Sequence, residues 1–235
     1  MNNDIPINNT TYANELYHPG LIPYDSRAEE IRFNKILKLI GRNKKILDIG
    51  CYDGSLGKLL INNNNEVYGI EINKESAKLA KKRGLRVKVQ DATETLGFKN
   101  DFFDIVVAGE IIEHILDTDF FINEIKRVLK PGGQLVLTTP NMASFGRRIL
   151  LLLGKNPHME ASLGFPPEAR AGHIRFFTKG LLIRYLQHKK FKVLKFTSDV
   201  VNFNRSGSLM SSFLANLFPT LGKTLIFLAK NQKQK

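Results

Sequence analysis

The feature that most constrains the fold is an alternation of short apolar runs with helical segments between residues 46 and 137. Runs rich in Val, Ile and Leu are typical of buried strands, and parallel strands need a crossover helix between them. The alternation therefore predicts an α/β fold, with a mostly parallel sheet covered by helices on both faces. The predicted strands are Ile46–Ile49, Val67–Ile72, Val87–Val89, Ile105–Ala108 and Leu135–Leu137, and the predicted helices are Ser55–Asn62, Lys74–Arg83 and Phe120–Leu129.

The segments on either side extend this pattern into one domain. Residues 1–26 lack periodicity and are predicted to form an N-terminal arm. A helix is predicted over Ser26–Leu39, with Ser26 as its N-cap and Glu29 as the acid of a capping box. Residues 27–235 are predicted to be a single domain with inserts at about 141–172 and about 200–222, and with a helix at Lys179–His188, a strand at Val193–Phe196 and a closing strand at Leu225–Ala229.

Charge is distributed unevenly along the chain, whose formal net charge is +13. The first 139 residues hold 19 Lys/Arg and 19 Asp/Glu, whereas the last 96 hold 16 Lys/Arg and 3 Asp/Glu. A one-sided basic surface attracts phosphorylated metabolites, nucleic acid or acidic lipid, and it can also serve simply as a solvated face.

Cysteine usage and hydropathy exclude several classes of protein. The single cysteine, Cys51, excludes an internal disulfide framework and is typical of a reducing compartment. The first twenty residues lack the charged start and apolar run of a signal peptide. The apolar run 149–153 is too short to cross a bilayer. We therefore expect a cytoplasmic protein.

The first predicted strand runs into a glycine-bearing turn, Asp48-Ile49-Gly50-Cys51-Tyr52-Asp53-Gly54. Glycines allow a ligand to approach the backbone, and the helix that follows offers free N–H donors. A turn of this kind is shared by all Rossmann-like folds. Tyr52 stands where a dinucleotide site needs its second glycine, which argues against a pyrophosphate ligand.

Acidic residues end the next two predicted strands. Glu71 lies twenty-one residues after Gly50, where a carboxylate can accept both hydroxyls of a ribose. Asp91, in Gln90-Asp91-Ala92, can accept the exocyclic amine of an adenine. Each acid alone could also be a helix cap. Acidic residues at the ends of three successive predicted strands, Asp48, Glu71 and Asp91, form a more specific pattern.

On these residues the chain resembles the class I S-adenosylmethionine-dependent methyltransferases from about Lys44 to Asn141. The turn resembles their motif I, with Tyr52 in place of the middle glycine, and Glu71 and Asp91 match their next two acidic positions. Residues 101–107 are similar to their fourth-strand motif, and residues 127–135, with Pro131-Gly132-Gly133, are similar to the turn before strand five. The likeness is to type 11/23-like members, including those linked to methionine biosynthesis and envelope sugars.

This resemblance implies a Rossmann-like, seven-stranded, mostly parallel sheet with one antiparallel strand near the C-terminus, which the run Leu225–Ala229 would supply. It also implies that the chain is an enzyme that uses S-adenosylmethionine as its cofactor. The residues expected to bind the cofactor are Asp48, Gly50, Cys51, Tyr52, Gly54, Glu71, Ile72, Asp91, Ala92 and Glu110.

A cluster of polar residues follows the fourth predicted strand, in Gly109-Glu110-Ile111-Ile112-Glu113-His114. Glu110, Glu113 and His114 have helical spacing, so we expect them to share one face of a helix. His114, with a pKa near neutrality, is the candidate general base for an oxygen acceptor. The alternative is that Glu113 and His114 only hydrogen-bond to neighbouring loops.

The methyl acceptor remains open at this stage. We expect a small molecule, anionic or related to the cell envelope, and no metal. One alternative is a metal-dependent RNA 2′-O-methyltransferase, because E-x-x-E-H with a downstream histidine, here His173, resembles such enzymes. Another is a cofactor-binding partner of a biosynthetic enzyme without catalysis of its own. Oligomeric state is likewise open. The amphipathic run Met142–Leu153 suits a lid, a peripheral membrane contact, a dimer contact or an ordinary packed helix.

Overall fold

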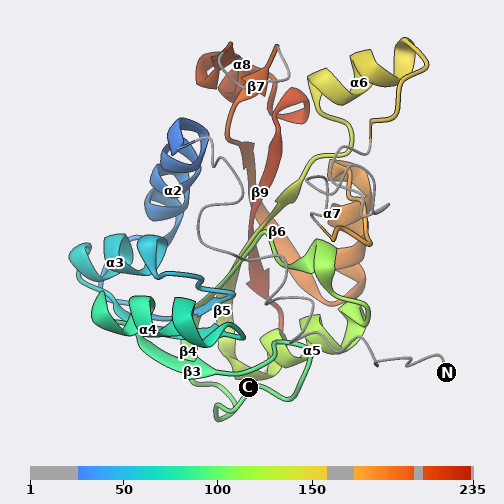
Figure 1. Cartoon of the computed structure of the whole chain (residues 1–235). Coiled ribbons are helices and arrows are strands. Elements are labelled where there is room, and N and C mark those ends of the chain that lie inside the picture. The colour runs from blue at the N-terminus through green and yellow to red at the C-terminus, as the bar shows by residue number, and fades with distance from the viewer. Residues whose placement is uncertain (1–25, 158–171, 204–208, 234–235) are drawn as a thin grey trace, which may run out of the picture.

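The structure is a computed structural model that describes residues 26–157, 172–203 and 209–233 (Figure 1). Its main sheet has seven strands in the order β3-β2-β1-β4-β5-β9-β6. β1 to β5 are parallel, and β9 is antiparallel to both β5 and β6, so the predicted fold class is confirmed. The strands are β1 (Lys45–Ile49), β2 (Glu66–Glu71), β3 (Arg86–Val89), β4 (Phe103–Gly109), β5 (Leu129–Pro140), β6 (Phe191–Ser198) and β9 (Thr224–Asn231).

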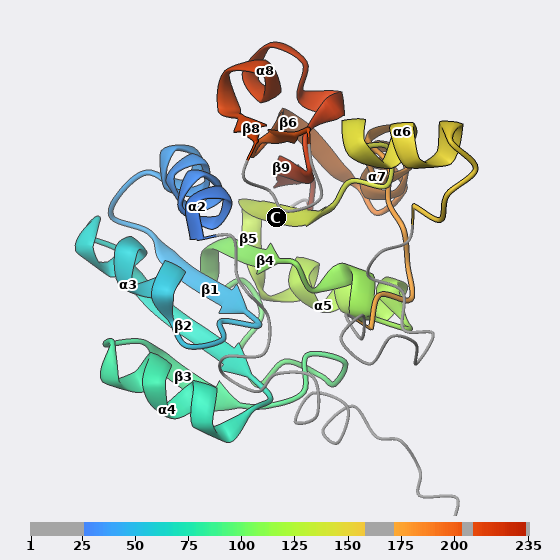
Figure 2. The ribbon, with the colours of Figure 1, turned by 45° about the horizontal axis from the view of Figure 1, so that its top comes forward.

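Helices cover both faces of this sheet (Figures 1 and 2). One face packs against α2, α3 and α4, and the other packs against α5 and α7. Near the edge of the sheet lie α6, α8 and a small hairpin of β7 and β8. The remaining elements are α2 (Ser26–Ile40), α3 (Ser55–Asn62), α4 (Lys74–Lys82), α5 (Thr118–Val128), α6 (Phe145–Leu152), α7 (Lys179–His188), α8 (Ser212–Leu217), β7 (Val201–Asn202), β8 (Met210–Ser211) and the 3-10 helices η1 (Ile112–His114) and η3 (Pro219–Leu221).

The central strands are apolar on both faces, which explains their continuous runs of Val, Ile and Leu. In β4, Val106 and Ala108 pack in the cluster beneath α5, whereas Ile105 and Val107 pack in the cluster beneath α3. All four are at most 1% exposed. Burial of a Val or Ile side chain stabilises the fold by about 1.5–3 kcal/mol, so these strands hold the two helical layers together.

Strand register brings the ends of several strands to one edge of the sheet. Ile49, the last residue of β1, is paired with Ile70 in β2 and with Ala108 in β4. At the start of β9, Thr224 is paired with Pro140, the last residue of β5. The turns after β1, β2 and β4 therefore lie at the same edge as the ends of β5 and β6. In open α/β sheets this carboxyl edge is where ligands bind.

The start of one helix, the start of one strand and the position of one turn differ from the sequence prediction. α5 begins at Thr118 rather than Phe120, because Asp117 caps it by accepting the Phe120 N–H at 2.9 Å. β5 begins at Leu129, before the Pro-Gly-Gly turn, because Leu129 already pairs with β4. Within that turn only Gly132 has a positive φ, of 74°. The glycine turn thus interrupts the strand instead of preceding it.

The first helix, α2, begins at Ser26. The preceding position and the side chain of Ser26 lie outside the described residues, so the capping role of Ser26 stays a prediction. Glu29 lies 3.5 Å from Arg32, one turn along the helix, in an ion pair. The predicted N-terminal arm up to residue 25, and residues 158–171 and 204–208 of the two predicted inserts, also lie outside the described residues. None of the described helices has the length and apolar character that crossing a membrane requires.

Gly54 and Gly41 provide a matched test of the turn after β1. Both have left-handed backbones, with φ of 80° and 77°. A Cβ on Gly54 would lie 2.7 Å from the Cα of Ala80, whereas one on Gly41 would meet nothing within 4 Å. We expect Gly41→Ala to lower the free energy of unfolding by about 1 kcal/mol through backbone strain alone. Gly54→Ala should cost about 2–4 kcal/mol, because steric overlap is added. Urea unfolding measures both, and equal losses would contradict this packing.

Candidate active site

The turn from β1 to α3 forms the first part of the site. The N–H groups of Gly50 and Cys51 donate to the Ile70 carbonyl oxygen at 2.8 and 3.1 Å, which ties the turn to β2. Gly50 has φ 71°, and a Cβ there would lie 3.2 Å from Cδ1 of Ile111. The turn therefore packs directly against the segment that follows β4. Glycine is needed here for its conformation and for this close approach.

Tyr52 occupies the position where the resemblance implies a middle glycine. It has φ 47°, a left-handed conformation that is uncommon for a bulky residue. Its N–H donates to Oε2 of Glu71 at 2.9 Å. This hydrogen bond holds the backbone in the conformation that glycine would adopt, so the departure from the motif changes the side chain but not the path of the chain.

Glu71 lies at the end of β2, beside that turn, and is 8% exposed. Its Oε1 accepts the N–H of Asn73 at 2.8 Å, while its Oε2 accepts that of Tyr52. Burial raises the pKa of Glu71, although these backbone donors oppose the rise. Each carboxylate oxygen has a further lone pair, so Glu71 can still accept the hydroxyls of a ligand.

Asp48 gives the site a second buried acid. It lies in β1, paired with Gly69 and Val107, and is 4% exposed. Burial, with a smaller contribution from Glu71, raises the pKa of Asp48 to about 7. Ionising both Asp48 and Glu71 is costly because they are buried and repel each other. A positively charged ligand would lower that cost, so the pair favours such a ligand.

Asp91 follows β3 as expected, but it takes part in a local turn. Its Oδ1 accepts both the N–H and the hydroxyl of Thr93, each at 2.8 Å. These bonds close a local turn and are not a helix cap, because no described helix begins directly after Asp91, and neither bond uses Oδ2. Ala92 is buried beside it, and Ile72 directly follows Glu71. The structure thus brings the predicted residues of the first three strand ends to one edge.

The segment after β4 is not the helix that we predicted. Glu110 has φ 52°, and the residues after it form only the single 3-10 turn η1. Glu110 therefore does not share a face with Glu113 and His114. Its Oε1 accepts the Thr138 hydroxyl at 2.9 Å, and its Oε2 lies 3.5 Å from Arg32 of α2. Burial raises the pKa of Glu110, while Arg32 opposes that rise.

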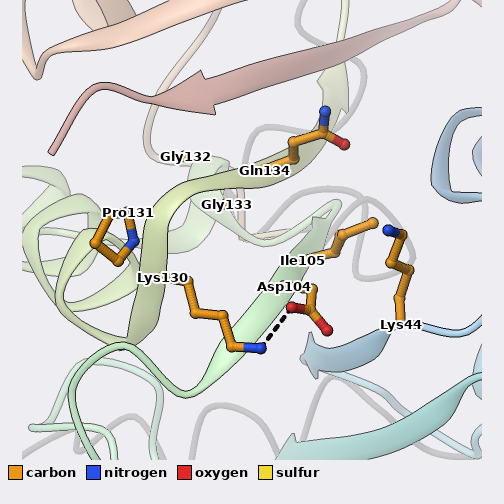
Figure 3. A pocket seen from close by; sticks show the side chains of 8 residues that line it. All are labelled: Lys44, Asp104, Ile105, Lys130, Pro131, Gly132, Gly133 and Gln134. Carbon is orange, nitrogen blue, oxygen red and sulfur yellow. Dashed lines mark hydrogen bonds and ion pairs between the residues drawn. The ribbon is translucent and has the colours of Figure 1, made fainter. Parts of the chain in front are cut away.

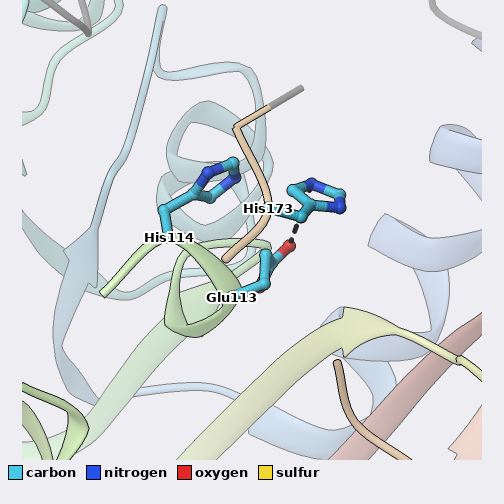
Figure 4. Close-up of side chains that lie close together, drawn as sticks. All are labelled: Glu113, His114 and His173. Atoms are coloured by element: carbon cyan, nitrogen blue, oxygen red, sulfur yellow. Dashed lines mark ion pairs between the residues drawn. The ribbon is translucent and has the colours of Figure 1, made fainter. Parts of the chain in front are cut away.

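Glu113 and His114, both in η1, form a separate cluster with His173 (Figure 4). One ligand atom from each of the three lies within 4.8 Å of the others. Glu113 is 1% exposed, and its Oε2 accepts the Thr139 hydroxyl at 3.0 Å. Its Oε1 lies 3.9 Å from Nε2 of His173 and has no hydrogen-bond partner among the described residues. His114 Nδ1 lies 3.3 Å from the carbonyl oxygen of Gly172. Because a carbonyl oxygen only accepts hydrogen bonds, Nδ1 of His114 is the donor in this contact.

Burial determines the charges of this cluster. It lowers the pKa of both His114 and His173 to about 4, and it raises the pKa of Glu113 well above its usual range. The expected near-neutral pKa of His114 is therefore wrong, because the imidazole is desolvated and lies beside His173. At neutral pH both rings are unprotonated, so His114 is already in the form that can accept a proton. A carboxyl group and two imidazoles are also donor types that could hold a transition-metal ion.

Three polar residues at the site were missed by the sequence analysis. Thr138 and Thr139 end β5 and bind Glu110 and Glu113, and a polar pair at the end of an apolar strand was a visible signal. Arg32 reaches Glu110 from α2. An arginine on an amphipathic helix gives no such signal, because its partner is set by tertiary packing.

A surface hollow of about 240 Å³ lies at the opposite edge of the sheet (Figure 3). Asp104, near the start of β4, accepts the N–H of Lys45 at 2.8 Å and the ammonium of Lys130 at 2.6 Å. These bonds join β1, β4 and β5 at their amino-terminal ends. The hollow is therefore remote from the turn between Gly50 and Gly54, and its polar residues already stabilise the sheet.

Comparisons with known proteins show which proteins this chain is similar to. Residues 47–137 match a family model described as a methyltransferase domain. The chain is 37% identical over 106 residues to the mitochondrial ubiquinone biosynthesis O-methyltransferase of Rattus norvegicus, a match that covers 41% of this chain and 31% of that protein. It is 30% identical over 147 residues to the ubiquinone biosynthesis O-methyltransferase of Idiomarina loihiensis, covering 60% and 58%. The chain thus spans less than two thirds of these relatives.

The same fold occurs in a solved structure of an S-adenosylmethionine-dependent methyltransferase from Thermotoga maritima, with a TM-score of 0.64 and 20% identity over 94% of this chain and 97% of that one. The matched residues 47–137 run from β1 through most of β5, and so include the glycine turn, Glu71 and Asp91. Residues 47–137 therefore match a methyltransferase domain, and the chain has the same fold as a solved S-adenosylmethionine-dependent methyltransferase.

Proposed function

We propose that this protein binds S-adenosylmethionine and transfers its methyl group to a small-molecule acceptor. The observation that carries the proposal is the pairing of two buried acids, Asp48 and Glu71, with the open backbone turn from Gly50 to Gly54. A ligand with a cationic sulfonium and a ribose satisfies both features. The positive charge offsets the cost of ionising the acids, and the ribose hydroxyls donate to Glu71.

Individual roles follow from the positions of the side chains. Glu71 accepts the ribose hydroxyls, and Asp91 accepts the adenine amine through Oδ2. Asp48 lies where the cationic part of the cofactor would bind. In this proposal the backbone and side chains that line the cofactor are those of Gly50, Cys51, Tyr52, Gly54, Ile72 and Ala92, with Glu110 at the methyl end.

The chemistry requires little acid–base catalysis, because a sulfonium methyl is already activated. Alignment of the acceptor with the methyl and exclusion of water provide much of the rate. An oxygen acceptor must also lose its proton, and His114 is our candidate base because its imidazole is buried and unprotonated. An oxygen acceptor agrees with the names of the curated relatives, which are O-methyltransferases.

We further propose that the acceptor is anionic or related to the cell envelope, rather than RNA. The excess of positive charge lies in residues 140–235, which also supply α6 and the β7–β8–α8 region at the carboxyl edge. Sequence-tolerant RNA binding needs exposed aromatic rings along a groove. Next to His173, Phe177 is only 6% exposed and packs in the core, so it offers no ring on which a base could stack beside the candidate site. Incubation of the protein with labelled cofactor and a cell extract should place the label in small molecules. Label in RNA would contradict this choice.

Cofactor binding gives the first prediction of the proposed function. S-adenosylhomocysteine should raise the melting temperature, because a ligand that binds only the folded state stabilises it by about 2.7 kcal/mol at 100 times its Kd. NAD should leave the melting temperature unchanged. Thermal shift and calorimetric titration measure both. Failure of both sulfur ligands to bind at millimolar concentration would overturn the proposal.

Glu71 provides a second prediction. Glu71→Ala should weaken binding of S-adenosylhomocysteine at least tenfold, because a charged acceptor for the ribose hydroxyls is worth about 1–3 kcal/mol. Glu75→Ala is the matched control, since Glu75 is an exposed glutamate on α4 that pairs only with Lys78 among the described contacts. It should bind as the parent does. Equal affinity of the Glu71 variant and the parent would exclude Glu71 from ribose binding.

Asp48 provides a third prediction, on pH. The pKa of Asp48 in the folded protein is about 7, so its carboxyl group is partly protonated at neutral pH. A neighbouring sulfonium cation would favour the ionised form of Asp48. Affinity for S-adenosylmethionine should therefore increase with pH through 7, by up to about tenfold per unit below the pKa. Asp48→Asn should remove this dependence. Asp53→Asn should retain it, because hydrogen bonds from Arg83 and Ser55 outweigh burial and hold the pKa of Asp53 below its usual range. A pH-independent affinity in the parent would contradict this role for Asp48.

A further inference from the structure

An apolar surface lies beyond the carboxyl edge, formed by α6 and the β7–β8–α8–η3 region. We call residues 145–153, 201–203 and 209–221 the edge surface. Figures 1 and 2 both show α6 and α8 at the same end of the molecule. Phe145 of α6 and Phe203 after β7 are in contact, with ring centroids 5.4 Å apart. Arg148 of α6 also reaches the Thr220 carbonyl oxygen of η3 at 3.5 Å. The two parts thus form one continuous surface.

Large apolar side chains are concentrated on this surface. A soluble monomer rarely exposes so many together without a partner. Most of them lie on the last turn of α6 and along α8. Their exposed fractions are Ile149 40%, Leu151 65%, Leu152 80%, Leu153 62%, Phe203 42%, Leu209 61%, Phe213 72%, Leu217 58% and Phe218 50%.

In the described segments on and beside this surface, every charged residue is basic. The described segments 141–157, 201–203 and 209–223 contain no Asp or Glu. Arg148, Lys155 and Lys223 are exposed on them. Asp199, at the end of β6, is only 2% exposed and accepts the N–H of Thr224, so it does not offset these charges at the surface.

Exposed apolar side chains next to exposed cations fit some binding partners better than others. A second copy of the chain would bring Arg148, Lys155 and Lys223 against their own counterparts, which is unfavourable without acidic residues between them. A bilayer with anionic headgroups matches both features, because the apolar side chains enter the headgroup–acyl boundary while the cations contact phosphate. We propose that the edge surface docks this protein onto an anionic lipid membrane.

Two hydrogen bonds, only two residues apart along the chain, connect the edge surface to the candidate active site. Arg147 of α6 donates to the Asn141 carbonyl oxygen at 2.8 Å, and Asn141 comes two residues after Thr139, which binds Glu113. Docking would therefore place the carboxyl edge next to the bilayer. If the proposed methyl transfer holds, an acceptor held in the lipid would reach the site without crossing water, and this consequence alone rests on the proposed function.

Vesicle binding tests the proposal directly. The full chain without cofactor should co-sediment with vesicles of phosphatidylglycerol and phosphatidylcholine at least tenfold more strongly than with phosphatidylcholine alone. Added salt should weaken this binding, because it screens the phosphate contacts. Leu152→Asp combined with Phe213→Asp should reduce binding at least tenfold. The matched control is Leu79→Asp on α4, where the parent leucine is 43% exposed, and it should bind as the parent does.

Several outcomes would overturn the proposal. These are no co-sedimentation with anionic vesicles at millimolar lipid, an equal loss in the Leu79 control, or a dimer in size-exclusion chromatography that the double variant dissolves. Circular dichroism confirms that each variant is folded. S-adenosylhomocysteine binding is measured separately, so membrane docking and the proposed methyl transfer can fail independently of each other.

Discussion

The carboxylate of Glu71 is the interaction on which the active-site edge depends. It accepts the N–H of Tyr52 in the turn after β1 and that of Asn73 at the start of α4. One buried side chain therefore fixes two loops that follow neighbouring strands. It also keeps Tyr52 in a left-handed conformation that a tyrosine would otherwise rarely adopt. The geometry of the turn from Gly50 to Gly54 thus depends on a residue nineteen positions beyond Tyr52, and not only on the glycines within the turn.

Much of the fold could be predicted because its strands are buried on both faces. Each central strand is then a continuous apolar run, and the helix after it shows as an amphipathic segment. α3 and α7 have the predicted bounds, and the antiparallel β9 lies where the closing run predicted it. The missed boundaries have local causes, since Asp117 starts α5 early and the pairing of Leu129 with Phe103 extends β5.

The candidate site was less predictable after β4. The spacing of Glu110, Glu113 and His114 fits a helix, yet Glu110 has a positive φ. Its carboxylate is held by Thr138 and faces Arg32, and these partners come from distant parts of the chain. Spacing within a segment cannot show such contacts. The positions of the strand-end acids were predictable for the opposite reason, because the sheet itself brings consecutive strand ends to one edge.

The position of β9 has a consequence for how the chain is assembled. β6 precedes β9 in the sequence, yet within the main sheet it pairs with β9 and is separated by it from β5. Until β9 is synthesised, β5 therefore presents an open edge next to Leu135 and Leu137, which are fully buried in the finished sheet. Open edges of this kind invite pairing with other chains. β5 and β6 can therefore take their final places in the sheet only once β9 is available to pair with both.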